Sequence, residues 1–186
     1  MAPDDASALR RQLDELVGQP MSNAGPAVAP DPVNLPMIRH WAAAFEDANP
    51  VYTNAAAASA SRFGEIVAPP LMLQTWTMPT PIITGIAERG GAPTAATGRT
   101  ALTVLDEAGY TGTLASNSEF ELERPVRLGE VITSENYLEA VSEPKQTRLG
   151  TGFFVTWVTT YCSDAGDVVG RQRFRVFKFQ PPRSGE

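Results

Sequence analysis

Residues 146–161 read QTRLGTGFFVTWVTTY, and this stretch decides the fold class. Its β-branched and aromatic residues favour a strand, in which successive side chains point to opposite faces of the sheet. One face then carries Phe153 and Val155, and the other carries Phe154 and Val158. Because both faces are apolar, we predict a central strand that is covered on both sides.

Three further strands surround this one along the chain. The pattern predicts strands over 112–123, 130–142 and 168–179, with turns at Gly129 and Gly166. In the first of them glutamates alternate with apolar residues, which leaves one face of that strand in contact with water. Strands joined by short turns pair antiparallel, so the second half of the chain predicts an antiparallel sheet.

The first half of the chain has a helical pattern. Helices are predicted over 5–17, from Asn34 to Asn49, and over 54–63, 69–79 and 100–108. Asn34 is suited to cap the second helix, because its side-chain oxygen can accept from a backbone N–H of the first turn. Residues 69–79, PPLMLQTWTMP, are apolar almost all round, so we expect that helix to be buried on most sides. The whole pattern predicts an α+β fold in which an antiparallel sheet wraps one buried helix.

The composition excludes several function classes. A chain of 186 residues with 42% hydrophobic residues is suited to one domain with a sizeable core. A net charge of -6 argues against nucleic acids and anionic membranes as partners, because binding to them relies on basic residues. The start is acidic, and no run approaches the roughly 18 apolar residues of a membrane span. We expect a cytoplasmic protein.

Metal and disulfide chemistry has few residues available. Cys162 is the only cysteine and His40 is the only histidine, so neither an intrachain disulfide nor a cysteine-based zinc site is expected. On a helical wheel His40 flanks a face made by Met37, Trp41 and Phe45. We therefore expect a solvated or interfacial structural role for this imidazole.

The segment FEDANPVY, residues 45–52, resembles the signature of the MaoC-like, R-specific enoyl-CoA hydratases and dehydratases. The similarity continues through Phe63-Gly64, through residues 66–70 and through RPVRLGE, residues 124–130. Asp-x-Asn-Pro alone is a common turn, whereas the combination of these segments is specific. The resemblance implies a single hot-dog fold, in which a curved antiparallel sheet wraps a central apolar helix.

The resemblance also implies the domain boundaries and the chemistry. A hot-dog domain of the MaoC-like or FAS1-like dehydratase type is expected over residues 1–180, with a tail or linker over residues 181–186. Family members add water reversibly to a trans-2-enoyl group held as a coenzyme A or acyl-carrier thioester, and no further cofactor is expected. Water is a weak nucleophile, so a base must take its proton and an acid must protonate the α-carbon.

The family meets these needs with an aspartate, a histidine five residues later and a backbone N–H at the head of the central helix. This chain has Asp47 and Asn49, but Tyr52 stands at the position of the histidine. An unperturbed phenol titrates near about 10, which makes it a poor base at neutral pH. The family's His-Gly reads here as Pro69-Pro70, and proline has no amide hydrogen to donate to a thioester oxygen. The resemblance therefore predicts a catalytically degenerate site at Asp47, Asn49, Tyr52 and Pro70.

Asp47 has three possible roles. It is a relic of the catalytic pair, a residue that shapes the turn into Asn49-Pro50, or a true catalytic group. Tyr52 is expected to be a packing aromatic rather than a proton donor.

A narrower resemblance concerns the large subunit of heteromeric actinobacterial steroid side-chain enoyl-CoA hydratases. It rests on VNLPMIRHW at residues 33–41, on residues 49–52 and on APPLMLQTW at residues 68–76. This resemblance implies a shorter catalytic hot-dog partner that supplies the aspartate and histidine, in a heterodimer or a dimer of heterodimers. It also implies an enoyl-CoA from cholesterol breakdown as the substrate, and a thiolase-like aldolase that docks through a C-terminal domain.

Two alternatives remain open. One is a self-sufficient, homo-oligomeric hydratase or thioesterase that uses Asp47, and the other is a scaffold for the downstream aldolase. The last residues, from Gln180 to Glu186, read as a linker. The chain is then either a truncation or a version without the docking domain.

Two sets of residues are candidates for contact with the substrate. Arg171, Arg173 and Arg175 project from one face of a strand and suit the phosphates of coenzyme A. The alternative is an ordinary stripe that faces glutamates 119, 121 and 123 on a neighbouring strand. The second set consists of the apolar residues Met72, Trp76 and Met78, which line a bulky acyl group or else pack in the core.

Overall fold

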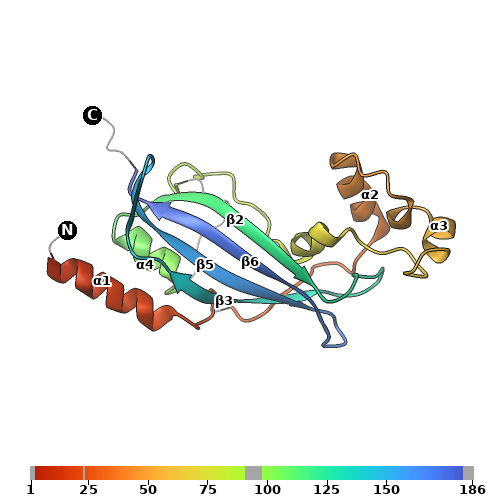
Figure 1. The fold of residues 1–186 in the computed structure, drawn as a ribbon, viewed down its shortest axis with the longest axis horizontal. Coiled ribbons are helices and arrows are strands. Elements are labelled where there is room, and N and C mark those ends of the chain that lie inside the picture. The colour runs from red at the N-terminus through yellow and green to blue at the C-terminus, as the bar shows by residue number, and fades with distance from the viewer. Residues whose placement is uncertain (1–2, 23, 91–97, 182–186) are drawn as a thin grey trace.

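A six-stranded antiparallel sheet forms the centre of the molecule (Figure 1). The computed structural model describes residues 3–22, 24–90 and 98–181. The strand order is β1-β3-β5-β6-β2, and β4 pairs with β5. The strands are β1 (Ala27–Val28), β2 (Gly112–Leu122), β3 (Thr133–Val141), β4 (Lys145–Thr147), β5 (Gly150–Cys162) and β6 (Val168–Phe179).

The predicted strands are confirmed, with one division. β5 lies between β3 and β6, which is the central place that its two apolar faces predict. The expected strand 146–161 is split into β4 and β5 because the chain turns at residues 148–149. Thr147 Oγ1 accepts from the N–H of Leu149 in this turn, and Gly150 has a φ of 121°, which favours glycine.

Helical segments lie at both ends of the sheet. They are α1 (Pro3–Leu16), α2 (Leu35–Ala44), η1 (Pro50–Tyr52), α3 (Ala55–Ser59), η2 (Pro70–Thr77) and α4 (Ala101–Glu107), of which η1 and η2 are 3₁₀ segments. The predicted cap of α2 is confirmed, since Asn34 Oδ1 accepts from the N–H of Met37 at 3.0 Å. α2 buries Ile38 and Ala42, whereas Met37 and the following Phe45 are exposed. Its apolar side chains therefore spread beyond the face that packs on the core.

The prediction of an α-helix over 69–79 is wrong in type. The segment forms the 3₁₀ turns of η2, because Pro69 and Pro70 remove two donors and the downstream Pro79 disfavours α geometry before it. η2 is nevertheless buried, as its apolar sequence predicts, with Met72 and Leu73 in the core.

No single long helix fills the inner face of the sheet within the described residues. Instead, two separate clusters cover it. One cluster joins α1 and α4 to the sheet, with Leu13, Leu105 and Val155 fully buried. The other joins α2 and η2 to the opposite end, with Ile38 and Met72 fully buried. In Figure 1, α4 lies behind the sheet while α2 and α3 extend beyond its end.

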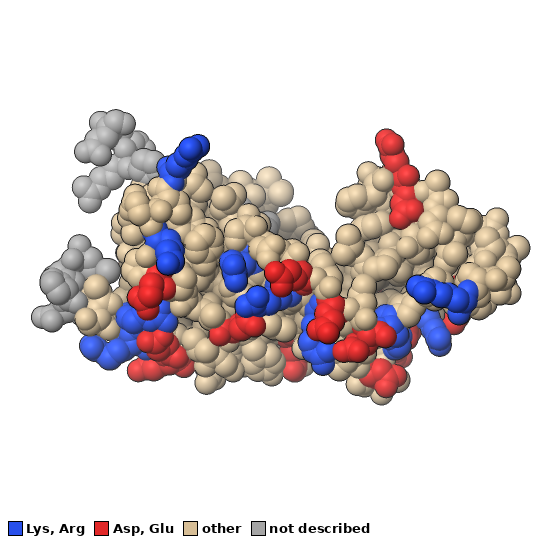
Figure 2. Space-filling model, viewed as in Figure 1, with Lys and Arg blue, Asp and Glu red and all other residues tan. Residues whose placement is uncertain are grey.

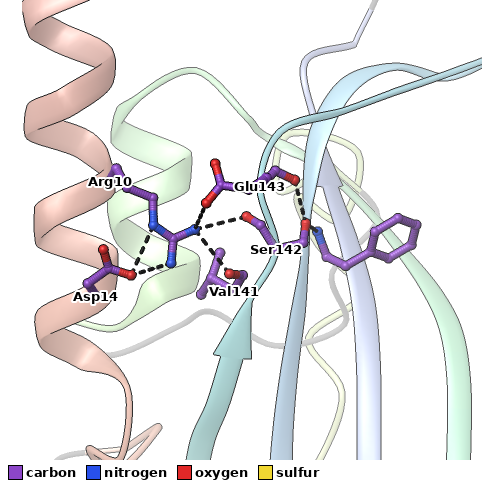
Figure 3. A network of polar contacts seen from close by, with 6 residues as sticks. Arg10, Asp14, Val141, Ser142 and Glu143 are labelled. Atoms are coloured by element: carbon purple, nitrogen blue, oxygen red, sulfur yellow. Dashed lines mark hydrogen bonds and ion pairs between the residues drawn. The ribbon is translucent and has the colours of Figure 1, made fainter.

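Arg10 fixes α1 to the end of β3 (Figure 3). Its guanidinium donates to the backbone oxygens of Val141 and Ser142, at 3.0 Å each. It also pairs with Asp14 on the same helix and with Glu143 at 3.6 Å. The hydrogen bond with Arg10 lowers the pKa of the Asp14 carboxyl. The Arg10 side chain thus satisfies two backbone carbonyl groups at the end of β3.

The outer face of the sheet carries charges of both signs, which Figure 2 shows side by side over β2 and β6. β2 and β6 pair so that Glu121 lies opposite Arg171 and Glu119 lies opposite Arg173. The arginines of β6 therefore face the glutamates of β2, as the alternative to coenzyme A binding supposed. Arg171 pairs with Glu123 at 2.8 Å, on an exposed surface.

Candidate functional site

The turn that follows α2 is built by side-chain oxygens. Glu46 has a φ of 53°, which ends the helix in the left-handed region. Asp47 Oδ1 then accepts from the N–H of Asn49 at 3.0 Å, and Asn49 Oδ1 accepts from the N–H of Val51 at 3.2 Å. The Asp47 carboxylate therefore shapes the turn into Asn49-Pro50, which is one of the roles that the sequence allowed.

Tyr52 leaves this turn and lines a cavity of about 370 Å³. Its side chain is half-buried. Burial raises the pKa of the Tyr52 hydroxyl, the negative charge of Asp47 raises it further, and a contact with the Asn49 side chain lowers it in part. The phenol consequently stays neutral at pH 7, and a neutral phenol is a poor base.

The head of η2 forms another wall of this cavity, through Ala68, Pro69 and Pro70. The N–H of Ala68 donates to the backbone oxygen of Val126 at 2.8 Å. The two prolines have no amide hydrogen. Three consecutive residues at the head of the segment thus offer no backbone donor to a ligand in the cavity.

The other walls come from two segments that carry the resemblance to MaoC-like hydratases, around Phe63 and around Arg124. The Arg62 guanidinium lies over the Phe63 ring, 4.7 Å from its centre. Arg124 pairs with Glu130 at 2.8 Å. The cavity therefore brings together the positions 52 and 70, which sequence reasoning selected, and Arg62, which it missed. An arginine beside an aromatic residue was the available signal.

Comparison with protein families matches residues 23–172 to the FAS1-like dehydratase domain region. This chain belongs to that family. The MaoC-like resemblance read from residues 45–52 is thereby confirmed.

Two curated relatives of this FAS1-like domain are hydratase subunits. A protein from Thermomonospora curvata named probable enoyl-CoA hydratase alpha subunit is 39% identical over 175 residues, which is 94% of this chain and 53% of the relative. The 3-oxo-4,17-pregnadiene-20-carboxyl-CoA hydratase alpha subunit of Mycobacterium tuberculosis is 38% identical over 176 residues, 92% of this chain and 53% of the relative. The chain spans about half the length of these relatives.

Solved structures confirm the hot-dog fold. A chain of the ChsH1-ChsH2 complex from Mycobacterium tuberculosis has a TM-score of 0.77 and 32% identity, with 96% of this chain and 95% of that chain covered. The (R)-hydratase from A. caviae involved in PHA biosynthesis has a TM-score of 0.54 at 18% identity, with 86% and 94% covered, and shares the fold.

The three apolar candidates of the FAS1-like domain do not form one surface. Met72 is fully buried and Trp76 is 4% exposed, so both side chains pack from η2 into the core. Met78 is 56% exposed. Nε1 of Trp76 is buried and has no hydrogen-bond partner in the described part of the chain.

The three arginines of β6 lie on the outer face, and each makes a polar contact with another side chain. Arg173 pairs with Glu139, and Arg175 Nε donates to Thr156 Oγ1 at 3.0 Å. Arg171 pairs with Glu123, which is one of the residues that line the cavity. A role for this set in binding coenzyme A stays a prediction.

Metal ligands do not gather anywhere in residues 3–22, 24–90 and 98–181. His40 is exposed on α2, as its place on the helical wheel predicts. In the same described ranges, no helix is both long enough and apolar enough to cross a membrane.

Proposed function

We propose that this chain is the catalytically degenerate subunit of a heteromeric enoyl-CoA hydratase that acts on a bulky, steroid side-chain 2-enoyl-CoA. A shorter hot-dog partner supplies the aspartate and histidine, and this chain completes the acyl-binding tunnel. The observation that carries the proposal is the cavity in which Tyr52 and Pro70 meet. These are the positions at which the MaoC-like family is expected to carry its histidine and its backbone donor.

The groups at this cavity do not suit hydration of a double bond. A base must take a proton from water near neutral pH, and a phenol whose pKa is raised is neutral there. The developing enolate needs a donor aimed at the thioester oxygen, and residues 68–70 have none free. Asp47 remains, but Oδ1 of its carboxylate already accepts from the N–H of Asn49.

Two observations support a partner subunit. Both curated relatives are named alpha subunits, and the ChsH1-ChsH2 structure is a complex. In the described structure β2 is a strand of 11 residues that pairs with β6 on one side and with no strand on the other. A free strand edge offers a row of backbone donors and acceptors to a neighbouring sheet.

The aromatic side chains on the inner face of the sheet are evidence for a bulky acyl group as the substrate. Trp157 and Phe174 pack against the first core cluster and Phe120 packs against the second, and all three side chains are half-buried. Half-buried aromatic side chains suit a large apolar ligand. The Mycobacterium tuberculosis relative carries a steroid acyl group in its name.

The experiment uses the complex of this chain with its hot-dog partner, carrying either Asp47→Asn or Tyr52→Phe. Asparagine keeps the side-chain oxygen that accepts from Asn49, so the turn is retained. We expect kcat/KM for a steroid enoyl-CoA to change by less than about threefold, because neither group moves a proton. Removing the aspartate or histidine of the partner is the matched control, with an expected loss of about 100-fold or more. A comparable loss in the Asp47→Asn complex would show that this chain catalyses.

A further inference from the structure

A network of hydrogen-bonded polar side chains crosses the inner face of the sheet. It takes no part in the hydration chemistry proposed above. Tyr161 and Gln172, on β5 and β6, are 3% and 5% exposed. The Tyr161 hydroxyl donates to Gln172 Oε1 at 2.8 Å. Gln172 Nε2 donates to Gln74 Oε1 on η2 at 2.8 Å and to Ser118 Oγ on β2 at 2.9 Å. These contacts link four elements through one glutamine.

The direction of these hydrogen bonds determines which donors the network leaves free at Gln74 and Ser118. The Tyr161 hydroxyl is the donor in its hydrogen bond with Gln172 Oε1. Both amide hydrogens and the oxygen of Gln172 are then occupied. Gln74 and Ser118 accept from it with oxygen, so the Gln74 amide N–H groups and the Ser118 O–H are left as donors. In residues 3–22, 24–90 and 98–181, no acceptor for either donor is found.

These two donors lie beside aromatic side chains. Ser118 is opposite Phe174 in the β2–β6 register, and Phe120 is opposite Gln172. The Phe174 ring packs 5.1 Å from the ring of Trp157. Gln74 is half-buried and Ser118 is exposed, so a ligand can reach both. The surface is therefore apolar with two hydrogen-bond donors set into it.

Stability alone does not explain this arrangement. Buried hydrogen bonds contribute modestly compared with an apolar core of the same shape, and burying polar groups without partners is costly. A network that ends in donors at an open surface is suited to a ligand that brings an acceptor. The aromatic neighbours require the rest of that ligand to be apolar.

We propose that Gln74 and Ser118 bind a ketone oxygen carried by the fused-ring acyl group, with Gln172 and Tyr161 as positioning residues. This inference rests on the proposed function for the class of substrate. It adds the polar group that the inner face recognises. A ketone oxygen accepts two hydrogen bonds through its two lone pairs, which matches two donor groups held next to each other by the same Gln172 amide nitrogen, at 2.8 and 2.9 Å.

The test measures binding of three steroids to the full chain by equilibrium dialysis from a cyclodextrin carrier. The ligands are a saturated steroid with one ketone, the alcohol made by reducing it, and the parent hydrocarbon. We expect the ketone to bind about three- to tenfold more tightly than the hydrocarbon, as one or two neutral hydrogen bonds allow. The alcohol, which also accepts, should bind no more tightly than the ketone.

Substitutions of Gln74 and Ser118 test whether these two residues cause the preference for the ketone. Gln74→Leu and Ser118→Ala should each reduce the preference for the ketone by about two- to fivefold and leave the affinity for the hydrocarbon unchanged. Ser118 is exposed, so its replacement removes one hydrogen bond from Gln172 and no packed core group. Gln146→Leu is the matched control, because Gln146 is exposed on β4 and contacts Thr151 instead of the network.

Several results would overturn this inference. They are equal binding of ketone and hydrocarbon, tighter binding of the alcohol, an equal effect of Gln146→Leu, or no binding of any of the three. Hydratase activity of the complex is measured separately. If the complex hydrates a steroid enoyl-CoA while the ketone has no advantage, the proposed function stands and this inference fails.

Discussion

Gln172 and Lys178 are two polar residues of β6 whose side chains point inward. The sequence predicts this direction but not the groups that they contact. Arg171, Arg173 and Arg175 point outward, so the alternation of a strand places Gln172 and Lys178 inward. That much follows from the sequence. The partners do not, because Asp106 and Gln74 come from distant segments that only the folded chain brings close. The same reason explains why the Asp47 turn was foreseeable, whereas the site at Tyr52 and Pro70 was predicted only through the family resemblance.

Lys178 gives an asymmetric prediction for stability. Its side chain is 3% exposed and pairs with Asp106, which is 40% exposed, and it also donates to Thr113 at 2.9 Å. Asp106→Ala leaves a buried ammonium without its counter-ion and should cost about 3 kcal/mol in urea unfolding. Lys178→Met leaves a carboxylate that water still reaches, so it should cost about 1 kcal/mol. A larger loss for Lys178→Met would contradict this assignment.

Tyr161 predicts a loss of stability in alkali. Burial raises the pKa of its hydroxyl above the ordinary value of 10.0. The folded state therefore keeps the proton after the unfolded state has lost it. The stabilisation is complete below pH 10.0 and is lost as pH rises towards the folded pKa, by about 1.4 kcal/mol per pH unit.

Tyr161→Phe isolates this contribution. Below pH 10.0 the variant should be less stable than the parent chain by about 1 kcal/mol, because the hydrogen bond to Gln172 is missing. Above that pH the difference should shrink and then reverse. Urea unfolding across this range measures it, and a difference that does not change with pH would disprove the assigned burial.

At the scale of elements, the features that depend on neighbouring residues were predictable from the sequence, whereas the features that depend on tertiary packing were not. The N-cap at Asn34 and the strand β6 match their predictions because both depend on neighbouring residues. η2 differs from the predicted helix because an apolar segment between prolines is compatible with more than one compact form. The buried face of α2 was also not predictable, since its apolar residues are spread around the helix and its packing partners decide which of them are covered.

Arg10 provides the test at this scale. Arg10→Met removes the donors to Val141 and Ser142 and should destabilise the chain by about 1 kcal/mol. Hydrogen exchange should become faster in α1 and at the end of β3, and remain unchanged in β6. Arg11→Met is the control, because Arg11 is the exposed neighbour on the same helix. Equal effects of the two substitutions would show that Arg10 does not anchor the helix.

At the scale of the whole molecule, the fold matches that of solved hot-dog structures. η2 and α4 cover the inner face of its six-stranded sheet as two short pieces. The free edge of β2 and the cavity at Tyr52 and Pro70 lie on a scaffold that matches hydratases. The proposed account is that such a scaffold shapes a shared substrate site and leaves proton transfer to its partner.

The most direct test is the rate at which the purified chain hydrates a steroid 2-enoyl-CoA, followed by loss of the enoyl absorbance, first alone and then with its hot-dog partner. The account predicts no turnover above the uncatalysed rate for the chain alone and full activity once the partner is added. Turnover by the homogeneous chain alone, at a rate similar to that of the mixture, would contradict it.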